Sequence, residues 1–330
     1  MNVMECVKNG LFYLDGGTGT SLQAMGLASG ELPELWNLEH PQKVVELERA
    51  YFEAGSHAVA TNTFGANGLK FDGRDGRPSL HAVIRAAVHC AKEARDTARG
   101  GQKNRFVALD IGPLGRMLEP LGDLPFEAAV ELFAEIVRIG TAEGADFVLI
   151  ETMNDAYETK AAVLAAKENT DLPIFVSNVY DENAKLMTGA TPEAMAALLE
   201  GLRVDVMGIN CSLGPDQMLK LLPRLAACTS LPLLVKPNAG MPHSRSGRTV
   251  YDVDAAHFAA VMKQAARQGA RVIGGCCGTT PEYIRQMVAA AGSVEPLPLT
   301  PKRRSVISSY AGAVEFGAAP VLIGERINPT

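Results

Sequence analysis

Two adjacent cysteines, Cys276 and Cys277, stand at the end of an apolar run in the segment GGCCGTTP, just before an expected helix. A third cysteine, Cys211, follows a similar apolar run in the segment MGINCS. Thiolates are soft ligands that zinc accepts, and three protein ligands leave one position of a tetrahedral ion open. The three cysteines therefore predict an open, catalytic zinc site that could hold a further thiol as its thiolate.

Two simpler interpretations of the cysteine pair remain open. Buried cysteines often serve as small hydrophobic residues, and a disulfide between neighbours is strained. The glycines at 274, 275 and 278 favour a ligand site, because they let the backbone approach a ligand closely. Cys6, Cys90 and Cys228 are interpreted as structural background.

Composition limits the class of protein. The chain has 330 residues and a formal net charge of -6, which suits a large α/β core and gives no electrostatic footprint for nucleic acid. No apolar run is long enough to span a membrane, and the N-terminus lacks a signal-peptide pattern. Six cysteines without framework spacing fit a reducing compartment, so a cytoplasmic location is expected.

Short apolar runs alternate with amphipathic or alanine-rich segments along the chain. The predicted strands are 11–14, 57–61, 106–110, 147–150, 174–176, 204–209, 233–235 and 272–273. The predicted helices are 41–54, 81–98, 126–143, 156–167, 192–200, 216–227, 254–268 and 281–290. Eight such pairs predict a (β/α)8 TIM barrel. A doubly wound open sheet is the alternative, and the lack of a Gly-x-Gly-x-x-Gly turn after the first strand disfavours it.

The barrel prediction has a consequence for function, because active sites of this architecture lie at the C-terminal ends of the strands. The unusual residues of the chain fall there. They are Asp15 to Thr20, Thr61 to Phe64, Asp110 to Pro113, Glu151 to Met153, Ser177, Asn178, Cys211, Pro237 to Gly240, Cys276 and Cys277. We therefore expect these residues to meet at one mouth.

The last part of the chain predicts a different organisation. The barrel is expected to occupy 1–294, and the proline-rich, basic stretch that opens 295–319 reads as a linker. A second apolar run within 320–330 is interpreted as the first strand of a following domain.

The motifs together resemble the homocysteine S-methyltransferase family over residues 10–290. The matching segments are DGGTGT at 15–20, TNTF at 61–64, GINC at 208–211, KPNAG at 236–240 and GGCCGTTP at 274–281. Within the family, the chain is most similar to the N-terminal homocysteine-binding module of cobalamin-dependent methionine synthases. The tail IGERINPT at 323–330 resembles the opening strand of their folate-binding barrel.

The resemblance implies a zinc ion held by Cys211, Cys276 and Cys277, with Asn238 as the fourth ligand in the resting state. Two positions differ from sister families. Betaine-using members carry a tyrosine where this chain has Gly65, and the S-methylmethionine enzymes tend to have arginine where it has Gly278.

The substrate implied by the resemblance is homocysteine, which needs an anion site and an ammonium site. The backbone N–H groups of Gly16 and Gly17 are expected to hold the carboxylate, since glycine-rich turns bind anions. Asp15 and Glu151 are candidates for the ammonium, although a turn cap and a solvated acid are the simpler interpretations. The residues expected to shape the pocket are Asn62, Thr63 and Ser177, and those expected to orient ligand loops are Asn210 and Lys236.

The implied methyl donor is methylcobalamin on a separate module, replenished from a folate-binding module. Donors such as betaine or S-methylmethionine remain alternatives, as does a structural zinc barrel without methyl transfer. A metal-dependent aldolase or lyase would prefer carboxylate and histidine ligands. The histidines, which include His243 and His257, show no such clustering.

Overall fold

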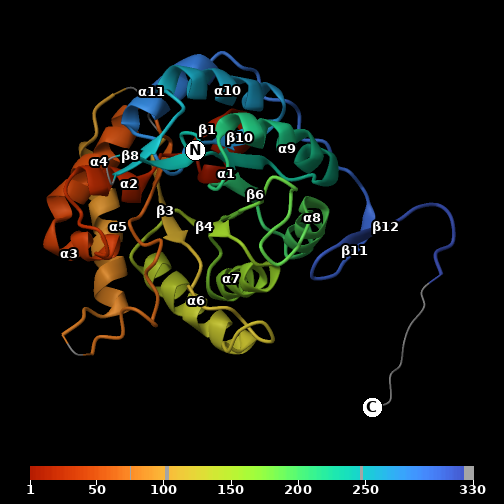
Figure 1. Cartoon of the computed structure of the whole chain (residues 1–330), viewed down its shortest axis with the longest axis horizontal. Coiled ribbons are helices and arrows are strands. Elements are labelled where there is room, and N and C mark those ends of the chain that lie inside the picture. Colours follow the sequence, from red (N-terminus) through yellow and green to blue (C-terminus); the bar gives the residue numbers. More distant parts are fainter. Residues whose placement is uncertain (75, 101–103, 246–247, 323–330) are drawn as a thin grey trace.

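The computed structural model describes residues 1–74, 76–100, 104–245 and 248–322, and its strands form a barrel surrounded by helices (Figure 1). Within those residues, eight parallel strands pair in the order β1-β10-β7-β6-β5-β4-β3-β2. Their bounds are β1 Phe12–Tyr13, β2 Ala58–Ala60, β3 Phe106–Ile111, β4 Phe147–Met153, β5 Ile174–Asn178, β6 Val206–Asn210, β7 Leu233–Lys236 and β10 Ala270–Ile273. The predicted (β/α)8 barrel is confirmed.

Each predicted helix is also present, with ends that differ by a few residues. The helices are α4 Pro41–Glu53, α5 Leu80–Thr97, α6 Phe126–Ala142, α7 Ala156–Asn169, α8 Pro192–Gly201, α9 Pro215–Cys228, α10 Ala255–Arg267 and α11 Pro281–Ala291. Side-chain caps fix several starts, as at Asp155 before α7 and Asp254 before α10. Among the described helices, none is long and apolar enough to cross a membrane.

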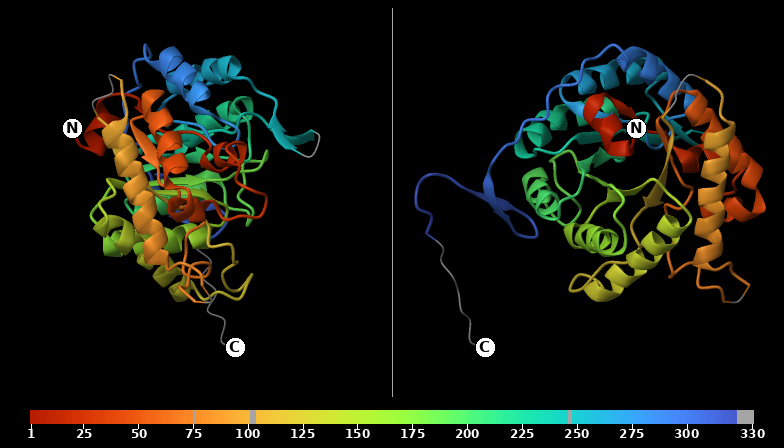
Figure 2. Two further views of the ribbon diagram at one scale, coloured as in Figure 1. Left: turned by 90° about the vertical axis from the view of Figure 1, so that its left-hand side faces the viewer. Right: turned by 180° about the vertical axis from the view of Figure 1, so that it is seen from behind.

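Further elements were not predicted because their apolar patterns are short. They are α1 Val3–Asn9, α2 Thr18–Ala24, η1 Pro33–Leu35, α3 Trp36–Glu39 and the hairpins β8 Pro242–Arg245 with β9 Arg248–Tyr251 and β11 Ser305–Ser308 with β12 Ala313–Phe316. A capping box between Asn2 and Glu5 starts α1. Val3, Cys6 and Val7 of that helix join the core inside the barrel. In the left view of Figure 2, α1 and the β8–β9 hairpin lie at opposite ends of the molecule.

The barrel interior is apolar at the α1 end. Phe12, Phe106, Phe147 and Phe175 pack there, and the rings of the last two lie 4.6 Å apart between centroids. Alternate residues of each strand face inward. Along β3, Phe106 and Ala108 join this inner core, while the residues between them pack outward against the helices.

Side chains close the barrel between β1 and β2, which are the two ends of the hydrogen-bonded strand order. The Tyr13 N–H donates to His57 Nδ1 at 3.0 Å, and the His57 N–H donates to the Tyr13 carbonyl at 2.7 Å. The Ala60 N–H donates to Asp15 Oδ2 at 2.7 Å. We call this contact between β1 and β2 the seam.

The segment 295–319, which was interpreted as a linker, contains the β11–β12 hairpin. The hairpin packs against α8 and lies outside the ring of helices (Figure 1). Its turn residue Tyr310 donates a hydrogen bond to Asp155 at the start of α7. The predicted strand of a following domain falls mainly on 323–330, which lie outside the described residues.

Candidate active site

The three predicted metal ligands meet at the mouth of the barrel. Sulfur atoms of Cys211, Cys276 and Cys277 all lie within 4.8 Å of one another, and Cys211 Sγ is 3.9 Å from Cys277 Sγ. Cys211 follows β6, and the pair follows β10, with β7 between them in the sheet. The convergence expected from the strand order is therefore present.

Backbone geometry holds each cysteine in place. Cys211 adopts φ +56°, an uncommon conformation for a residue with a side chain, and its N–H donates to the Lys236 carbonyl at 3.1 Å. The Cys276 N–H donates to the Pro237 carbonyl at 2.9 Å. Gly278 needs φ +80°, and a Cβ there would overlap the ring of Tyr251. The loop is thus shaped around the sulfur atoms.

The three cysteines of the cluster shift one another's pKa values. Hydrogen bonds from Cys276 and Cys277 lower the pKa of Cys211 to about 3. The same hydrogen bond with Cys211 raises the pKa of Cys277 to about 11 and also raises the pKa of Cys276. The protonation of each sulfur atom is therefore linked to that of the other two. By contrast, burial raises the pKa of Cys90 to about 12, which is typical of an unreactive structural thiol.

Asn238 lies beside the cysteines, and its side chain is used within the protein. Its Oδ1 accepts the N–H of Cys277 at 3.1 Å, and its side chain helps to lower the pKa of Cys211. Its place next to two sulfur atoms is compatible with the ligand role expected for it. Binding a metal through Oδ1 would require this oxygen to leave or share the Cys277 N–H.

Asn210 links the cysteines to the neighbouring strands. Its Nδ2 donates to Thr152 Oγ1 at 2.7 Å and to Cys276 Sγ at 3.8 Å. Its Oδ1 accepts from the Thr152 N–H at 2.9 Å and from the Ser177 hydroxyl at 2.8 Å. Thr152 has φ +64°, so this bidentate contact supports a strained residue next to Glu151. Asn210 therefore positions both Cys276 and the loop after β4.

Charged residues replace the apolar core at the top of the barrel. The inward alternation of Phe106 and Ala108 continues to Asp110, and that of Phe147 and Leu149 continues to Glu151. Leu234 is followed on β7 by Lys236, whose Nζ lies 2.6 Å from Glu151 Oε2 and 3.7 Å from Asp15 Oδ1. All four charged side chains are more than nine-tenths buried.

The pKa values of these groups follow from burial and from mutual contact. Burial raises the pKa of Asp15 to about 6, although Lys236 opposes the shift. Burial and the nearby Glu151 raise the pKa of Asp110. Burial lowers the pKa of Lys236, but Glu151 and Asp15 outweigh it, so that the pKa is raised overall. Lys236 is therefore a permanent buried cation.

A cavity of about 440 Å³ opens over the cysteines and the charged layer, and we call it the mouth cavity. Of the predicted site residues, those that line it are Gly16, Gly17, Asn62, Glu151, Cys211, Cys276 and Cys277. Asp15, Thr63, Ser177 and Asn238 lie behind this lining. The Gly17 N–H already donates to the carbonyl and hydroxyl oxygens of Thr279, at 2.9 and 3.2 Å. Asn62 donates to the Pro33 carbonyl and to Asn37, so it also anchors the segment that covers the mouth.

Two charged residues of the mouth cavity, Glu34 and Lys70, were not among the residues expected at the mouth. Asp110 was expected there as the end of a strand but was given no role, although it continues the inward phase of an apolar strand. Glu34 is in the short helix η1, and its position in the sequence carries no such signal. Its Oε1 accepts the Gly65 N–H at 2.6 Å.

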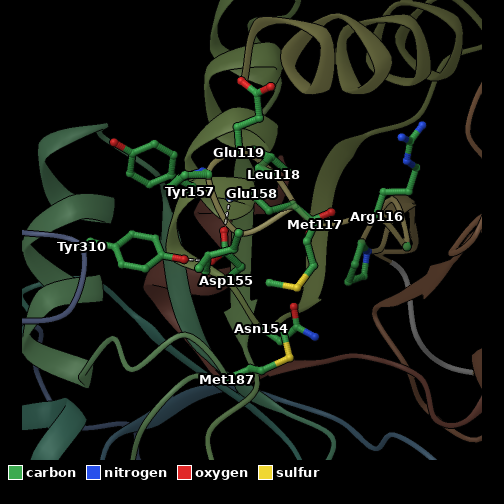
Figure 3. Close-up of a pocket in the computed structure, with 14 residues that line it drawn as sticks. Arg116, Met117, Leu118, Glu119, Asn154, Asp155, Tyr157, Glu158, Met187 and Tyr310 are labelled. Carbon is green, nitrogen blue, oxygen red and sulfur yellow. Dashed lines mark hydrogen bonds between the residues drawn. The ribbon is translucent and has the colours of Figure 1, made fainter. Parts of the chain in front are cut away.

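A second cavity of about 640 Å³ lies between the loops after β3 and β4. Tyr157 and Tyr310 lie on one side of it in Figure 3, and Met117 and Met187 project from the other loops. The Tyr310 hydroxyl points to Asp155. Burial raises the pKa of Glu158 in its wall to about 7. This cavity contains none of the predicted site residues.

A (β/α)8 barrel with three convergent cysteines at its C-terminal mouth is a protein of the class that could hold a metal ion with one position open. The homocysteine S-methyltransferase family model matches residues 12–291. The chain belongs to this family.

The chain is also similar to individual members. It is 30% identical to methionine synthase of Mycobacterium tuberculosis and to that of Mycobacterium leprae, over 99% of this chain. It spans only 28% and 29% of their lengths. The metallated form of homocysteine methyltransferase MmuM from Escherichia coli matches with a TM-score of 0.72 and 26% identity, over 86% of this chain and 96% of that one.

Proposed function

We propose that this barrel binds homocysteine and presents its sulfur as a thiolate for methyl transfer from methylcobalamin, which forms methionine. The observation that carries the proposal is the cluster of three cysteines beside buried carboxyl groups in one cavity. The sulfur atoms would meet the substrate thiol, and the carboxyl groups would meet its ammonium. The family match supports homocysteine as the substrate.

The donor set fits zinc. Three sulfur ligands within 4.8 Å of one another, with an open cavity above them, match a three-ligand catalytic site. A zinc ion held by Cys211, Cys276 and Cys277 would lower the pKa of the substrate thiol and so supply the nucleophile. Asn238 is proposed as the resting oxygen ligand, because its Oδ1 lies beside the cysteines and accepts the N–H of Cys277.

The residues of the chain prepare the sulfur for attack. With zinc bound, three thiolate ligands would leave electron density on the substrate sulfur, so this sulfur would stay nucleophilic. Asn210 and the strained loop geometry hold Cys276 and Cys211 in fixed positions. The sulfur would attack the methyl carbon directly, and the bond between methyl group and donor would break with its electron pair staying on the donor. The thiol proton would already have left when the substrate bound.

Two glycine positions of the chain support a donor other than betaine or S-methylmethionine. A Cβ at Gly65 would come within 2.6 Å of Glu34 Oε1, so Glu34 would have to move to admit the tyrosine expected in betaine-using relatives. A side chain at Gly278 would collide with Tyr251. We propose that the methyl group comes from cobalamin- and folate-binding modules of the same or a longer polypeptide, with residues 295–319 as the connection and 320–330 as the start of a further domain.

All six cysteines are free, which supports a reducing compartment such as the cytoplasm.

Metal content is the first test of this proposal. Protein purified under reducing conditions should contain about one zinc ion per chain, as expected for a three-cysteine site. Cys211→Ser should lose the metal, and Cys228→Ser should keep it because Cys228 lies far from the cluster on α9. Elemental analysis gives the result. Wild-type protein without zinc, even after reduction and reconstitution, would contradict the proposal.

The donor is tested separately on the zinc-loaded protein. Free methylcobalamin, S-methylmethionine or betaine is offered together with homocysteine, and methionine is measured. We expect methionine from methylcobalamin alone. Turnover with S-methylmethionine or betaine instead would show that the proposed donor is wrong, while the proposed homocysteine site would stand.

A further inference from the structure

The second cavity, between the loops after β3 and β4, has the make-up of a small-molecule site. Its volume of about 640 Å³ lies in the usual range for such sites, and its lining is mainly apolar and aromatic. Tyr157 and Tyr310 form one wall, and Met117 and Met187 project from the loops across from them (Figure 3). Met187 is 62% exposed, so the cavity opens to solvent on that side. The residues that line it are all different from those of the mouth cavity.

Glu158 places a carboxyl group in the wall of this cavity. The residue is 4% exposed, and its Oε1 accepts the Leu114 N–H at 2.8 Å. Its Oε2 forms no hydrogen bond with a described residue. The neighbouring Asp155 uses both of its oxygens, since Oδ1 accepts the Glu158 N–H at 2.7 Å and Oδ2 accepts from the Tyr310 hydroxyl. Glu158 Oε2 is therefore the acceptor in the buried wall that the protein leaves for a donor from outside.

The cations around this cavity are engaged elsewhere. Arg116 lies on the cavity wall and pairs with Asp123. Lys160, on the same helix as Glu158, lies over the ring of Phe126, 5.8 Å from its centroid. In the part of the chain that the structure describes, Glu158 forms no ion pair within 4.0 Å, and burial raises its pKa to about 7. A cation in the cavity would supply the opposite charge that this buried carboxyl group lacks.

We propose that the second cavity binds a small organic cation with an apolar or aromatic body, whose ammonium group donates a hydrogen bond to Glu158. The body would pack between the two tyrosines and the methionines, whose flexible side chains adapt to different shapes. Tyr310 belongs to the turn of the β11–β12 hairpin, so the ligand would contact the barrel and the hairpin together. Such a ligand would touch neither the cysteines nor the carboxyl groups of the mouth cavity, so this site is independent of the proposed function.

The test compares two probes of nearly the same shape, 2-phenylethylamine, which is a cation at neutral pH, and 2-phenylethanol, which is neutral. Each is titrated into the full chain, and its dissociation constant is measured by NMR. Glu158→Gln keeps an acceptor for the Leu114 N–H and removes the charge. We expect it to weaken binding of the amine by roughly tenfold or more, the usual effect of a charged hydrogen bond, and binding of the alcohol by less than about twofold.

Two further changes at exposed positions complete the experiment. Glu168→Gln, at the far end of α7, is the matched control and should change neither constant. Met187→Lys adds a positive charge at the rim of the cavity, and it should weaken the amine by roughly two- to fivefold relative to the uncharged Met187→Gln. This pair gives a result even where Glu158→Gln does not fold. A wild-type chain that does not bind the amine at millimolar concentration, or variants that affect amine and alcohol equally, would overturn the cation site and leave the thiol site untouched.

Discussion

Asn210 joins the cysteine cluster to the rest of the site through one side-chain amide. It contacts Cys276 and holds Thr152 on both sides, and it is completely buried. Residues that orient a metal ligand are often nearly as important as the ligand, because they fix its direction and basicity. The expectation that Asn210 orients a ligand loop has a specific geometric basis in these contacts.

Replacing Asn210 by Ala should therefore weaken metal binding without removing a ligand. We expect a loss of about 10–100-fold in zinc affinity, as is usual for such outer residues, measured by competition with a chromophoric chelator. Asn169→Ala, near the end of α7, is the matched control and should bind zinc normally. Equal affinities in Asn210→Ala and wild type would show that the cysteines need no such support.

The residues of the site differ in how far the sequence could reveal them. Cysteine is an uncommon residue type, so the three cysteines at strand ends could be identified directly from the sequence. Glu151 was identified by its position at the end of a strand. Asp110 needed the strand alternation in addition, since an aspartate after an apolar run also fits a turn. The hydrogen-bond partner of the Gly17 N–H is Thr279, and this contact joins two segments that are far apart in the sequence. No local pattern contains that information.

At the scale of elements, the seam between β1 and β2 depends on a neutral histidine. His57 Nδ1 accepts the Tyr13 N–H, and the ring stacks on Phe12 and Tyr13. Burial lowers the pKa of His57 to about 4. An unfolded histidine titrates near 6.5, so between about pH 6.5 and 4 the unfolded chain binds a proton that the folded chain does not.

The contribution of His57 to stability is therefore present above pH 6.5 and is lost as the pH falls toward 4. His57→Asn places an oxygen near the position of Nδ1 and cannot titrate. We expect it to flatten the fall of the urea midpoint between pH 7.5 and 5 relative to wild type, whatever its effect at pH 7.5. His81→Asn, at an exposed site, should keep the wild-type slope. An unchanged slope in His57→Asn would refute the role of the seam histidine.

The principal elements themselves were largely predictable. All eight strands and eight helices of the barrel follow from apolar periodicity, and their caps are local in sequence. The strand ends were less predictable, as β4 and β5 run on through Glu151 and Ser177 into the mouth. A strand predicted from its apolar residues ends at such polar residues, whereas the backbone hydrogen bonds between the strands continue past them. The two hairpins, β8–β9 and β11–β12, were missed because exposed strands have no apolar periodicity.

At the scale of the whole molecule, a bound metal should stabilise the fold. An ion that binds the folded chain adds stability by mass action, by about 2.7 kcal/mol when its free concentration is a hundred times the dissociation constant. Removing zinc with a chelator should lower the Tm measured by calorimetry, and adding zinc back should restore it. Cys211→Ser should show the same Tm with and without zinc. A wild-type Tm independent of zinc would argue against a site formed by the folded barrel.

Asp15 gives the barrel a property that neither the strands nor the cavity has alone. One of its oxygens closes the seam through Ala60, and the other faces Lys236 beside the mouth cavity. A change in the charge or position of this carboxyl group therefore acts on the seam and on Lys236 together. The N–H of Ala60 reports on the state of Asp15 as well as on the closure of the barrel.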